Sequence, residues 1–554
     1  MIPINGPRDV PTGVAVPASV LETAKATGIE ALPCKVYSPH DADTSAYLSA
    51  REDCWNKSVK DWPAVIAMPT TAQEVVAVVK LAAGKKVAVL SGGHSPMCMP
   101  NGAFLISLRK MNGVIVDPER MVVTAEGGAK IADVDNALKP HNFAAPLGTH
   151  PDTGIGGLTL GGGIGWLTPR VGLAIDNLVS AEVVLADGTL VTASAESEPE
   201  LFWALRGGGG NFGLVVSFTY KVFAVGGADG FEPGMVLAGV VPFPLEAFDR
   251  ATVIEKFSAD CLATDADNVQ ILLLALGGPC ISVFTHRAPQ RPACPSHSRL
   301  PPRPSSPTHP PTPHPRSLPA HPPTLPSPHL PAPADGTHAA AKAALDDLGK
   351  GYGTGVPPKD GVKPMPWTDG VQTLTGMGDP NGAGDLLVPG NSFYYTAGFV
   401  EQMTAEICAF LAKAQADAPD KTGIHAGGAV IVMPLNGPFN EVAPDATAIS
   451  ARGAKFWVVF MLRLEGDETQ MAEGIAWGRG LKKARRNPLQ PHARELLPAP
   501  TNRQTAHMSP SLLMTRAVRH PAPPASAPKA PAGPPSARAT GVHVDGGRGH
   551  RHAA

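Results

Sequence analysis

Long apolar runs are absent from the 554 residues, and none approaches the ~18 uninterrupted apolar residues of a membrane-spanning helix. We therefore expect no membrane as a partner. Residues 1–17 also lack the basic start and apolar core of a secretory signal, which predicts a cytoplasmic protein. The seven cysteines are scattered singly, so they form neither a zinc-binding spacing nor a small disulfide framework. This pattern indicates a reducing compartment and predicts no metal site.

Acidic residues are absent from the segment 287–334, in which 18 of the 60 prolines and five arginines gather. Residues 482–554 are likewise rich in proline and basic residues, so the remaining chain is strongly acidic, which argues against nucleic acid as a partner. We favour the interpretation that both segments are translated non-coding sequence, because the first separates a predicted strand from a predicted helix where a few residues suffice. A genuine proline-rich linker or a disordered interaction segment is the alternative.

Short strands and helices are predicted ahead of the first distinctive motif. The apolar run at 64–68 predicts a buried strand, and Thr71 with Glu74 forms the capping-box pattern of a helix start. A second strand predicted at 87–90 leads directly into Ser91-Gly92-Gly93-His94-Ser95. The sequence therefore places a glycine-rich loop at the end of a strand.

Glycine is concentrated in two such loops, Ser91–Ser95 and Gly154–Gly165. Without a Cβ, these loops let backbone N–H groups approach an anion closely, so together they could cradle a pyrophosphate. The alternative is that the glycines only form tight turns and bulges. A third glycine-rich loop at Arg206–Gly213 favours the cradle.

The run Gly208-x-Gly210-x-x-Gly213 formally matches the dinucleotide fingerprint. However, a helix is predicted before it and a strand after it, whereas the Rossmann motif runs strand, loop, helix. The chain also lacks a phosphate-binding P-loop, a Gly-x-Ser-x-Gly nucleophile elbow and paired histidines for zinc. A Rossmann-type nicotinamide dehydrogenase and a serine hydrolase are therefore not supported.

Five ordered blocks between residues 91 and 213 resemble a known family. They are Ser91-Gly-Gly-His-Ser95, Gly154-Ile-Gly-Gly-Leu-Thr-Leu-Gly-Gly-Gly-Ile-Gly165, Gly172-Leu-Ala-Ile-Asp-Asn177, Val184-Leu-Ala-Asp-Gly188 and Leu201-Phe-Trp-Ala-Leu-Arg-Gly-Gly-Gly-Gly-Asn-Phe-Gly213. In these blocks the chain resembles the FAD-linked oxidases of the vanillyl-alcohol oxidase/p-cresol methylhydroxylase superfamily. It is most similar to the berberine bridge enzyme-like branch and its bacterial 6-hydroxy-D-nicotine oxidase-like members.

The resemblance implies an α+β fold in which a two-part FAD-binding domain of the p-cresol methylhydroxylase type precedes an α+β substrate domain. We expect an N-terminal entry segment at 1–57 and the FAD-binding domain at 58–225. The substrate domain is expected at 226–481, interrupted by a disordered proline-rich insert at 287–334. Residues 482–554 are expected to form a disordered basic tail in place of the family's C-terminal FAD-domain segment.

The cofactor implied by the resemblance is FAD, attached covalently through His94, because this position carries the histidine that relatives join to the 8α carbon of the flavin. A neutral imidazole nitrogen is a competent nucleophile for that bond. Relatives with a second bond use a cysteine in a Gly-x-Cys-Pro sequence, and this chain has Gly148-Thr149-His150-Pro151 instead. We therefore expect one covalent bond. His150 either faces the flavin or the substrate, or serves only as a spacer.

The residues expected to bind FAD come from the glycine loops, one turn and the strand after the third loop. They are Ser91, Gly92, Gly93, His94, Ser95, Gly154, Gly156, Gly157, Gly161, Gly162, Gly163, Gly165, Asp176, Asn177, Gly213 and Val215. For Asp176-Asn177, a turn that stabilises itself through its side chains is an equal alternative. Ile155 lies close to a position whose side-chain size influences dioxygen access in relatives.

The activity implied by the resemblance is two-electron oxidation of a small-molecule alcohol, sugar or amine. Hydride passes to flavin N5, and dioxygen is the expected acceptor. Tyr394, Tyr395 and His425 lie in or beside predicted strands of the substrate domain, and none of them is preferred as the catalytic base. The substrate, the choice between oxidase and dehydrogenase, and the oligomeric state are left open.

One departure from the family supports a different function. Relatives end with an Asn-Tyr pair near the flavin and a final Asp-Pro turn, and the residues after Arg479 supply neither. The alternative hypothesis is therefore a non-catalytic or truncated flavin-fold protein that lacks a complete active site. A third hypothesis is an interaction protein whose proline-rich segments recruit partners.

Overall fold

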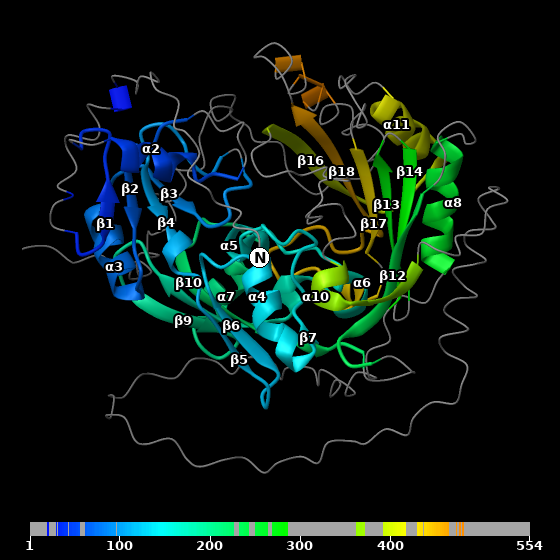
Figure 1. The fold of residues 1–554 in the computed structure, drawn as a ribbon, viewed down its shortest axis with the longest axis horizontal. Helices are drawn as coiled ribbons and strands as arrows, with labels where there is room; N and C mark the ends of the chain where they lie inside the picture. The colour runs from blue at the N-terminus through cyan, green and yellow to red at the C-terminus, as the bar shows by residue number, and fades with distance from the viewer. Residues whose placement is uncertain are drawn as a thin grey trace, which may run out of the picture.

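The computed structural model describes the chain in segments (Figure 1). The described residues are 19–20, 29, 32–41, 44–55, 61–95, 97–226, 232–242, 250–263, 269–276, 278–285, 362–371, 392–416, 429–435, 437–464, 472–473, 476–477 and 479–480. The insert at 287–334 and the tail at 482–554 lie outside these residues, so their disorder stays a prediction. Among the helices that the structure describes, none is both long and apolar enough to cross a membrane.

The first sheet has four strands in the order β1-β2-β4-β3 and lies at the blue end of the ribbon in Figure 1. Strands β2 and β3 run parallel to β4, and β1 runs antiparallel to β2. Two helices contribute side chains to the buried cluster around this sheet, among them Tyr47 and Val75. The elements are β1 (Lys35–Tyr37), α2 (Ser45–Glu52), β2 (Val65–Met68), α3 (Ala72–Leu81), β3 (Val87–Leu90) and β4 (Phe104–Ser107).

The start of α3 confirms the capping pattern predicted for Thr71 and Glu74. The backbone N–H of Glu74 donates to Thr71 Oγ1 at 3.2 Å, which satisfies one of the free donors at a helix start. The Glu74 carboxylate accepts from the backbone N–H of Thr70 at 2.6 Å. The helix therefore begins where the sequence indicates.

The second sheet is antiparallel and has five strands in the order β5-β6-β10-β8-β9. Its buried side chains, including Phe218 and Tyr220, form the core against which α4, α5 and α7 pack. The sequence favours a β-hairpin of residues 182–186 and 189–193 with Asp187-Gly188 as its two-residue turn, and the pairing of β8 with β9 confirms it. The elements are β5 (Val114–Asp117), β6 (Val122–Glu126), α4 (Ile131–Leu138), α5 (Ile155–Leu160), β8 (Leu178–Val184), β9 (Leu190–Ser194), α7 (Pro199–Leu205) and β10 (Leu214–Lys221).

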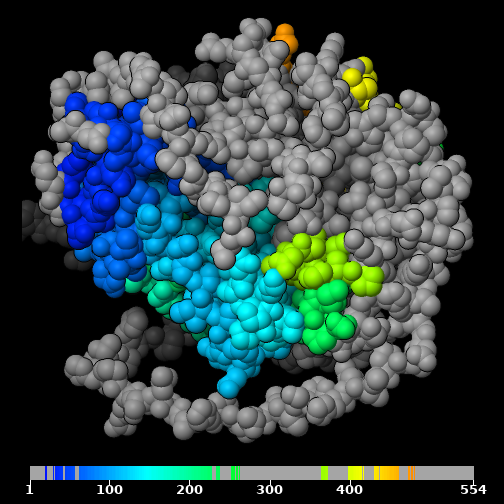
Figure 2. Space-filling view, in the orientation of Figure 1, coloured from blue at the N-terminus to red at the C-terminus, as the bar shows by residue number. Residues whose placement is uncertain are grey.

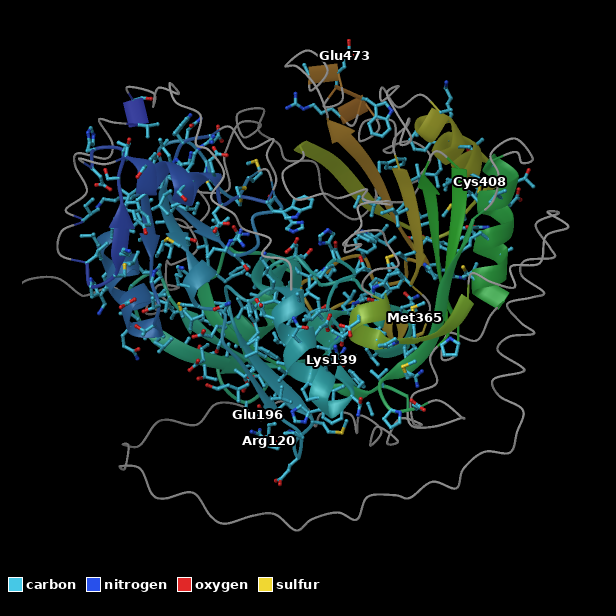
Figure 3. The ribbon with its side chains drawn as sticks, viewed as in Figure 1. Arg120, Lys139, Glu196, Met365, Cys408 and Glu473 are labelled. Carbon is cyan, nitrogen blue, oxygen red and sulfur yellow. The ribbon has the colours of Figure 1, made fainter. Side chains whose placement is uncertain are left out.

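The third sheet is a seven-stranded antiparallel sheet with the order β15-β12-β14-β13-β17-β18-β16, on the opposite side of the molecule in Figure 1. Helices α8 and α11 lie together on one of its faces, and Cys408 of α11, labelled in Figure 3, is buried there. The elements are β12 (Met235–Pro242), α8 (Arg250–Ala263), β13 (Val269–Leu276), β14 (Gly278–Thr285), β15 (Val362–Pro366), β16 (Ser392–Val400), α11 (Ala405–Ala416), β17 (Ala429–Pro434) and β18 (Phe456–Leu464).

The two halves meet along a buried apolar junction. Trp166, Met365 and Trp367 share one cluster there, and Lys139 forms an ion pair with Asp369 across its rim. Figure 2 shows the atoms of β15 and α10 lying against those near α4, and Figure 3 labels Lys139 and Met365 beside this contact. The small elements of the junction are η3 (Lys139–His141), β7 (Phe143–Ala144), α6 (Thr168–Val171), β11 (Phe223–Ala224), α10 (Trp367–Gly370) and α12 (Pro438–Glu441).

The predicted α+β fold class is confirmed, with two local differences. The sequence favours a helix near Val400–Ala414, whereas α11 begins only at Ala405, because Val400 still pairs with Phe456 as the end of β16. Residues 155–160 of the predicted glycine loop form the short helix α5. Along the chain, the strands of the first two sheets come before residue 226 and those of the third sheet come after it. The domain limits themselves stay predictions.

Candidate cofactor site

The loop Ser91–Ser95 follows β3 and touches the start of the second glycine loop. A Cβ on Gly92 would lie 2.2 Å from the backbone nitrogen of Gly154, and a Cβ on Gly154 would lie 2.1 Å from that of Gly92. Neither position has room for a side chain. Ser91 Oγ donates to the carbonyl of Gly127 at 2.8 Å, which fixes the first loop from behind. The structure therefore brings together the two loops that the sequence predicts to cradle an anion.

The other predicted glycines of the second loop have different surroundings. Gly156 faces the Gly127 carbonyl, whereas a Cβ on Gly157 would meet no atom within 4 Å. Gly161 lies at the end of α5, where its N–H bonds to the carbonyl of Gly157 at 3.3 Å. Gly162, Gly163 and Gly165 serve close packing: a Cβ on them would press against Ile449, Ala174 and the Leu147 carbonyl, respectively.

Three aromatic rings gather beside the Gly92–Gly154 contact. The Trp55 indole stacks on the His94 imidazole, with ring centroids 3.9 Å apart and ring planes 8° from parallel. The His150 imidazole meets both edge-on, at 5.3 Å from His94 and 5.5 Å from Trp55. The structure thus places His150 next to the predicted flavin-linking histidine, rather than leaving it as a distant spacer.

His150 is held in one tautomer by its neighbours. Its Nδ1 accepts a hydrogen bond from the backbone N–H of Asp152 at 3.2 Å, so in the neutral ring the proton lies on Nε2. This Nε2 is buried and makes no hydrogen bond within the described part of the chain. The Asp152 carboxylate itself accepts from Lys130 Nζ at 3.0 Å. His150 therefore keeps a buried N–H donor that no described residue accepts.

Both histidines are neutral near pH 7. Burial lowers the pKa of His94 from 6.5 to about 3, and the neighbouring His150 adds to the effect. Burial likewise lowers the pKa of His150 to about 4, although Asp152 acts in the opposite direction. A neutral imidazole carries a lone pair on one ring nitrogen, so His94 has the protonation state that a nucleophile requires.

Asp176 lies at a different place, where the third sheet meets the loops. Arg452 binds its carboxylate with both terminal nitrogens, at 3.0 Å and 2.5 Å, and the two side chains are only 1 % and 7 % exposed for Arg452 and Asp176, respectively. Asn177 donates to the carbonyls of Val171 and Leu173, both at 2.9 Å. The contacts of Asn177 are those of a turn, which was the alternative interpretation of Asp176-Asn177. Asp176 in addition forms a salt bridge to Arg452 of the other half of the protein.

The third glycine loop lies between the second loop and the same interface. Its Gly209 N–H donates to the carbonyl of Leu160 at 3.0 Å, and Arg206 Nη2 donates to that of Ala446 at 2.9 Å. Gly213 packs on β8, where a Cβ would lie 2.6 Å from Val183. Val215 is buried in β10, and its carbonyl lies 2.5 Å from where a Cβ on Gly127 would be. Val215 therefore supports the residue that Ser91 binds.

Several residues of the site do not belong to the predicted set. Trp55 carried no sequence signal, since it is an isolated aromatic residue in the entry segment. Gly127 and Gly128 did carry a sequence signal, because two adjacent glycines follow residues 121–125, whose pattern favours a strand.

Two residues of the predicted set, Gly93 and Ser95, shape the loop around His94. Gly93 has φ +74°, and Ser95 accepts from the backbone N–H of Met97 at 3.1 Å.

The candidate bases of the third sheet are only partly described. Tyr394 and Tyr395 lie on β16, opposite Leu462 and Met461 of β18, as the predicted strand requires. Their side chains and all of His425 lie outside the described residues, so no base is assigned. Within the described part of the chain, no group of three metal-ligating side chains occurs.

The residues around His94 fit a flavin nucleotide. A neutral nucleophilic ring, a buried N–H donor without a partner on His150, and two glycine positions without room for a Cβ converge at one place. The family model of an FAD binding domain matches residues 63–194, which include all of these features except Trp55. Residues 63–194 are therefore similar to an FAD binding domain. This match supports FAD as the cofactor, and its attachment to His94 stays a prediction.

Curated relatives of the FAD binding domain are FAD-linked oxidoreductases, which confirms the predicted resemblance. The xylooligosaccharide oxidase of Thermothelomyces thermophilus is 37% identical over 225 residues, which are 39% of this chain and 45% of that protein. The (R)-6-hydroxynicotine oxidase of Paenarthrobacter nicotinovorans is 31% identical over 254 residues, 45% of this chain and 52% of that protein. The chain thus matches about half of the length of these relatives.

Solved structures confirm the fold. A variant of berberine bridge enzyme, described as a reticuline dehydrogenase, has a TM-score of 0.64 at 17% identity and covers 86% of both chains. The 6-hydroxy-D-nicotine oxidase from Arthrobacter nicotinovorans has a TM-score of 0.61 at 22% identity, covering 82% of this chain and 85% of that one. This likeness confirms the predicted α+β fold.

Proposed function

We propose that the chain is an FAD-dependent oxidoreductase that carries its flavin covalently on His94 and oxidises a small-molecule alcohol, sugar or amine. The observation that carries the proposal is the position of a neutral His94 between Trp55 and His150, beside the Gly92–Gly154 contact of the FAD binding domain. The relatives that oxidise xylooligosaccharides and 6-hydroxynicotine support the substrate classes. Dioxygen is the proposed acceptor.

Each residue of the site has a definite part in this proposal. A ring nitrogen of His94 attaches the cofactor, which keeps it from dissociating. Gly92 and Gly154 let the two glycine loops meet backbone to backbone, and in this proposal the joined loops hold the anionic part of the cofactor. His150 holds a proton at Nε2 and offers it to an acceptor on the flavin or the substrate. The bound flavin supplies a two-electron acceptor.

The deciding experiment is in-gel flavin fluorescence of acid-denatured protein, comparing wild type with His94→Ala. His150→Ala serves as the matched control, because it removes the neighbouring imidazole and leaves His94 in place. We expect fluorescence in wild type and in His150→Ala and none in His94→Ala. Yellow wild-type protein that loses all fluorescence on denaturation would refute covalent attachment.

A second measurement tests activity. Wild-type protein is mixed with a panel of oligosaccharides, primary alcohols and cyclic amines, and both flavin bleaching and hydrogen peroxide release are recorded. We expect at least one class to bleach the flavin in the absence of oxygen and to release peroxide in air. Flavin that stays oxidised with every class would favour the alternative hypothesis of a flavin-fold protein without a complete active site.

A further inference from the structure

Trp55 lies outside every glycine motif, yet it covers one face of the His94 ring. The two rings are nearly parallel, at 8°, and their centroids are 3.9 Å apart. The third ring, His150, stands at 77° to His94 and contacts it from another direction. His94 is thus confined on one face by an indole and at a second place by an imidazole.

The backbone that carries Trp55 is attached to the His94 loop at several points. Cys54 Sγ donates to the carbonyl of Gly93 at 3.2 Å. A Cβ on Gly93 would lie 3.1 Å from the backbone nitrogen of Trp55, so a side chain at position 93 would press the two segments slightly apart. Arg109 Nη2 joins them from the side, donating to the carbonyls of Asp53 at 2.9 Å and Gly92 at 3.4 Å.

The orientation of the ring matters for bond formation. The terminal torsion of a histidine has broad minima, so an imidazole on a loop samples many ring planes. The reacting lone pair lies in the plane of the ring and must point at the 8α carbon of the flavin. A stacked indole restricts that plane, and an aromatic stack of this kind biases an orientation by up to about tenfold.

We infer that Trp55 is a positioning residue that holds His94 in the orientation from which it forms its bond to FAD. The inference rests on the proposed function and names a residue that the glycine motifs do not contain. Trp55 affects the rate at which His94 attaches FAD. The affinity for unattached FAD stays unchanged, because in this proposal the glycine loops bind the cofactor and Trp55 is not part of them.

The attachment step balances with dioxygen as the oxidant. One nitrogen of His94 forms a bond to the 8α carbon, one C–H bond of that carbon breaks, and the N–H proton of the imidazole leaves. Two protons and two electrons are thereby released in total. The electrons pass through the flavin to dioxygen, which takes up both protons and becomes hydrogen peroxide.

The test compares Trp55→Phe, which keeps an aromatic ring, with Trp55→Leu, which keeps an apolar side chain without one. Full-length apoprotein is produced in riboflavin-starved cells and mixed with FAD in air. The fraction of acid-stable flavin is followed over time, and the affinity for FAD before attachment is measured by quenching of flavin fluorescence. Trp203→Leu is the control for loss of a tryptophan, since this side chain lies on α7, outside the ring cluster.

We expect Trp55→Leu to attach FAD about tenfold more slowly than wild type at unchanged affinity, and Trp55→Phe to restore most of the rate. Attachment at the wild-type rate in Trp55→Leu would overturn the inference, as would a Trp55→Phe variant as slow as Trp55→Leu. Should Trp55→Leu fail to bind FAD, the comparison of Trp55→Phe with wild type decides. Wild-type protein without acid-stable flavin would instead refute covalent attachment itself.

Discussion

Two buried clusters of ionisable side chains flank the glycine loops, and they are stabilised in opposite ways. His94 and His150 are both neutral, because burial lowers their pKa values to about 3 and about 4. Asp176 and Arg452 instead form a salt bridge with two contacts, in which Arg452 also donates to the carbonyl of Phe439. The histidine cluster is therefore neutral, whereas the Asp176–Arg452 cluster is a pair of opposite charges.

We assign the two clusters different roles: the salt bridge joins the two halves of the protein, and the histidines belong to the cofactor site. The Asp176 carboxylate is paired with both terminal nitrogens of Arg452, and this salt bridge joins the FAD binding domain to the loop before β18. In the other cluster, His150 keeps a buried Nε2–H that bonds to no residue in the described part of the chain. Unsatisfied polar atoms inside a protein cost free energy, which indicates a function for them.

The largest expected effect comes from breaking the salt bridge. Arg452→Ala leaves the buried Asp176 carboxylate without its partner, and we expect the unfolding free energy to fall by about 3–5 kcal/mol. Denaturant titration measures the change. The double variant Asp176→Asn/Arg452→Met should recover much of the loss, because no unpaired charge remains. Equal destabilisation in both variants would show that charge pairing is not the cause.

A glycine substitution tests the histidine side of the comparison. Gly92→Ala places a Cβ 2.2 Å from the Gly154 backbone, so the two loops must separate. We expect a loss of about 1–3 kcal/mol in stability together with loss of FAD binding, measured by flavin content. Gly210→Ala is the matched control, since a Cβ there meets nothing within 4 Å and Gly210 is not among the residues expected to bind FAD. Normal flavin content in Gly92→Ala would contradict the proposal that the loops of Gly92 and Gly154 bind the cofactor.

Acid should weaken the apoprotein through the neutral histidines. Between pH 6.5 and about 4 the unfolded chain binds protons at His150 that the folded chain does not, so the unfolding free energy falls as pH falls. We expect about 1.5 kcal/mol from His150 between pH 6.5 and 5. Denaturation of wild type and His150→Gln at both pH values isolates this contribution. An identical pH dependence in the two proteins would contradict a neutral buried His150.

The smallest effect is expected at the edge of the interface. Trp203 Nε1 donates to the carbonyl of Asp445 at 2.7 Å, and the side chain is 41 % exposed. Trp203→Phe removes this bond at a surface where water replaces it, so we expect a change of about 0.5–1 kcal/mol. Thermal denaturation detects it. A loss as large as that of Arg452→Ala would mean that the interface does not depend mainly on the salt bridge.

Local patterns predicted the parts of the site that lie within short segments. The capping residues Thr71 and Glu74, the strand before Ser91 and the meeting of the two glycine loops follow from spacing and from the resemblance. Arg452 could not be found in this way, since it pairs with Asp176 across 276 residues of chain. Trp55 was missed for a related reason: a single aromatic residue has no local pattern that could reveal its stacking partner.

The arrangement around β12 has a consequence for chain length. Thr285, the last residue of β14, pairs with Leu237 of β12, and Val362, the first residue of β15, pairs with Gly239 on the other side of the same strand. Residues 286–361 therefore leave and rejoin the sheet about 10 Å apart. The entropy of loop closure grows only with the logarithm of length, so deleting 287–334 would change it by about 1 kcal/mol. The sheet register places almost no constraint on how long this connection is.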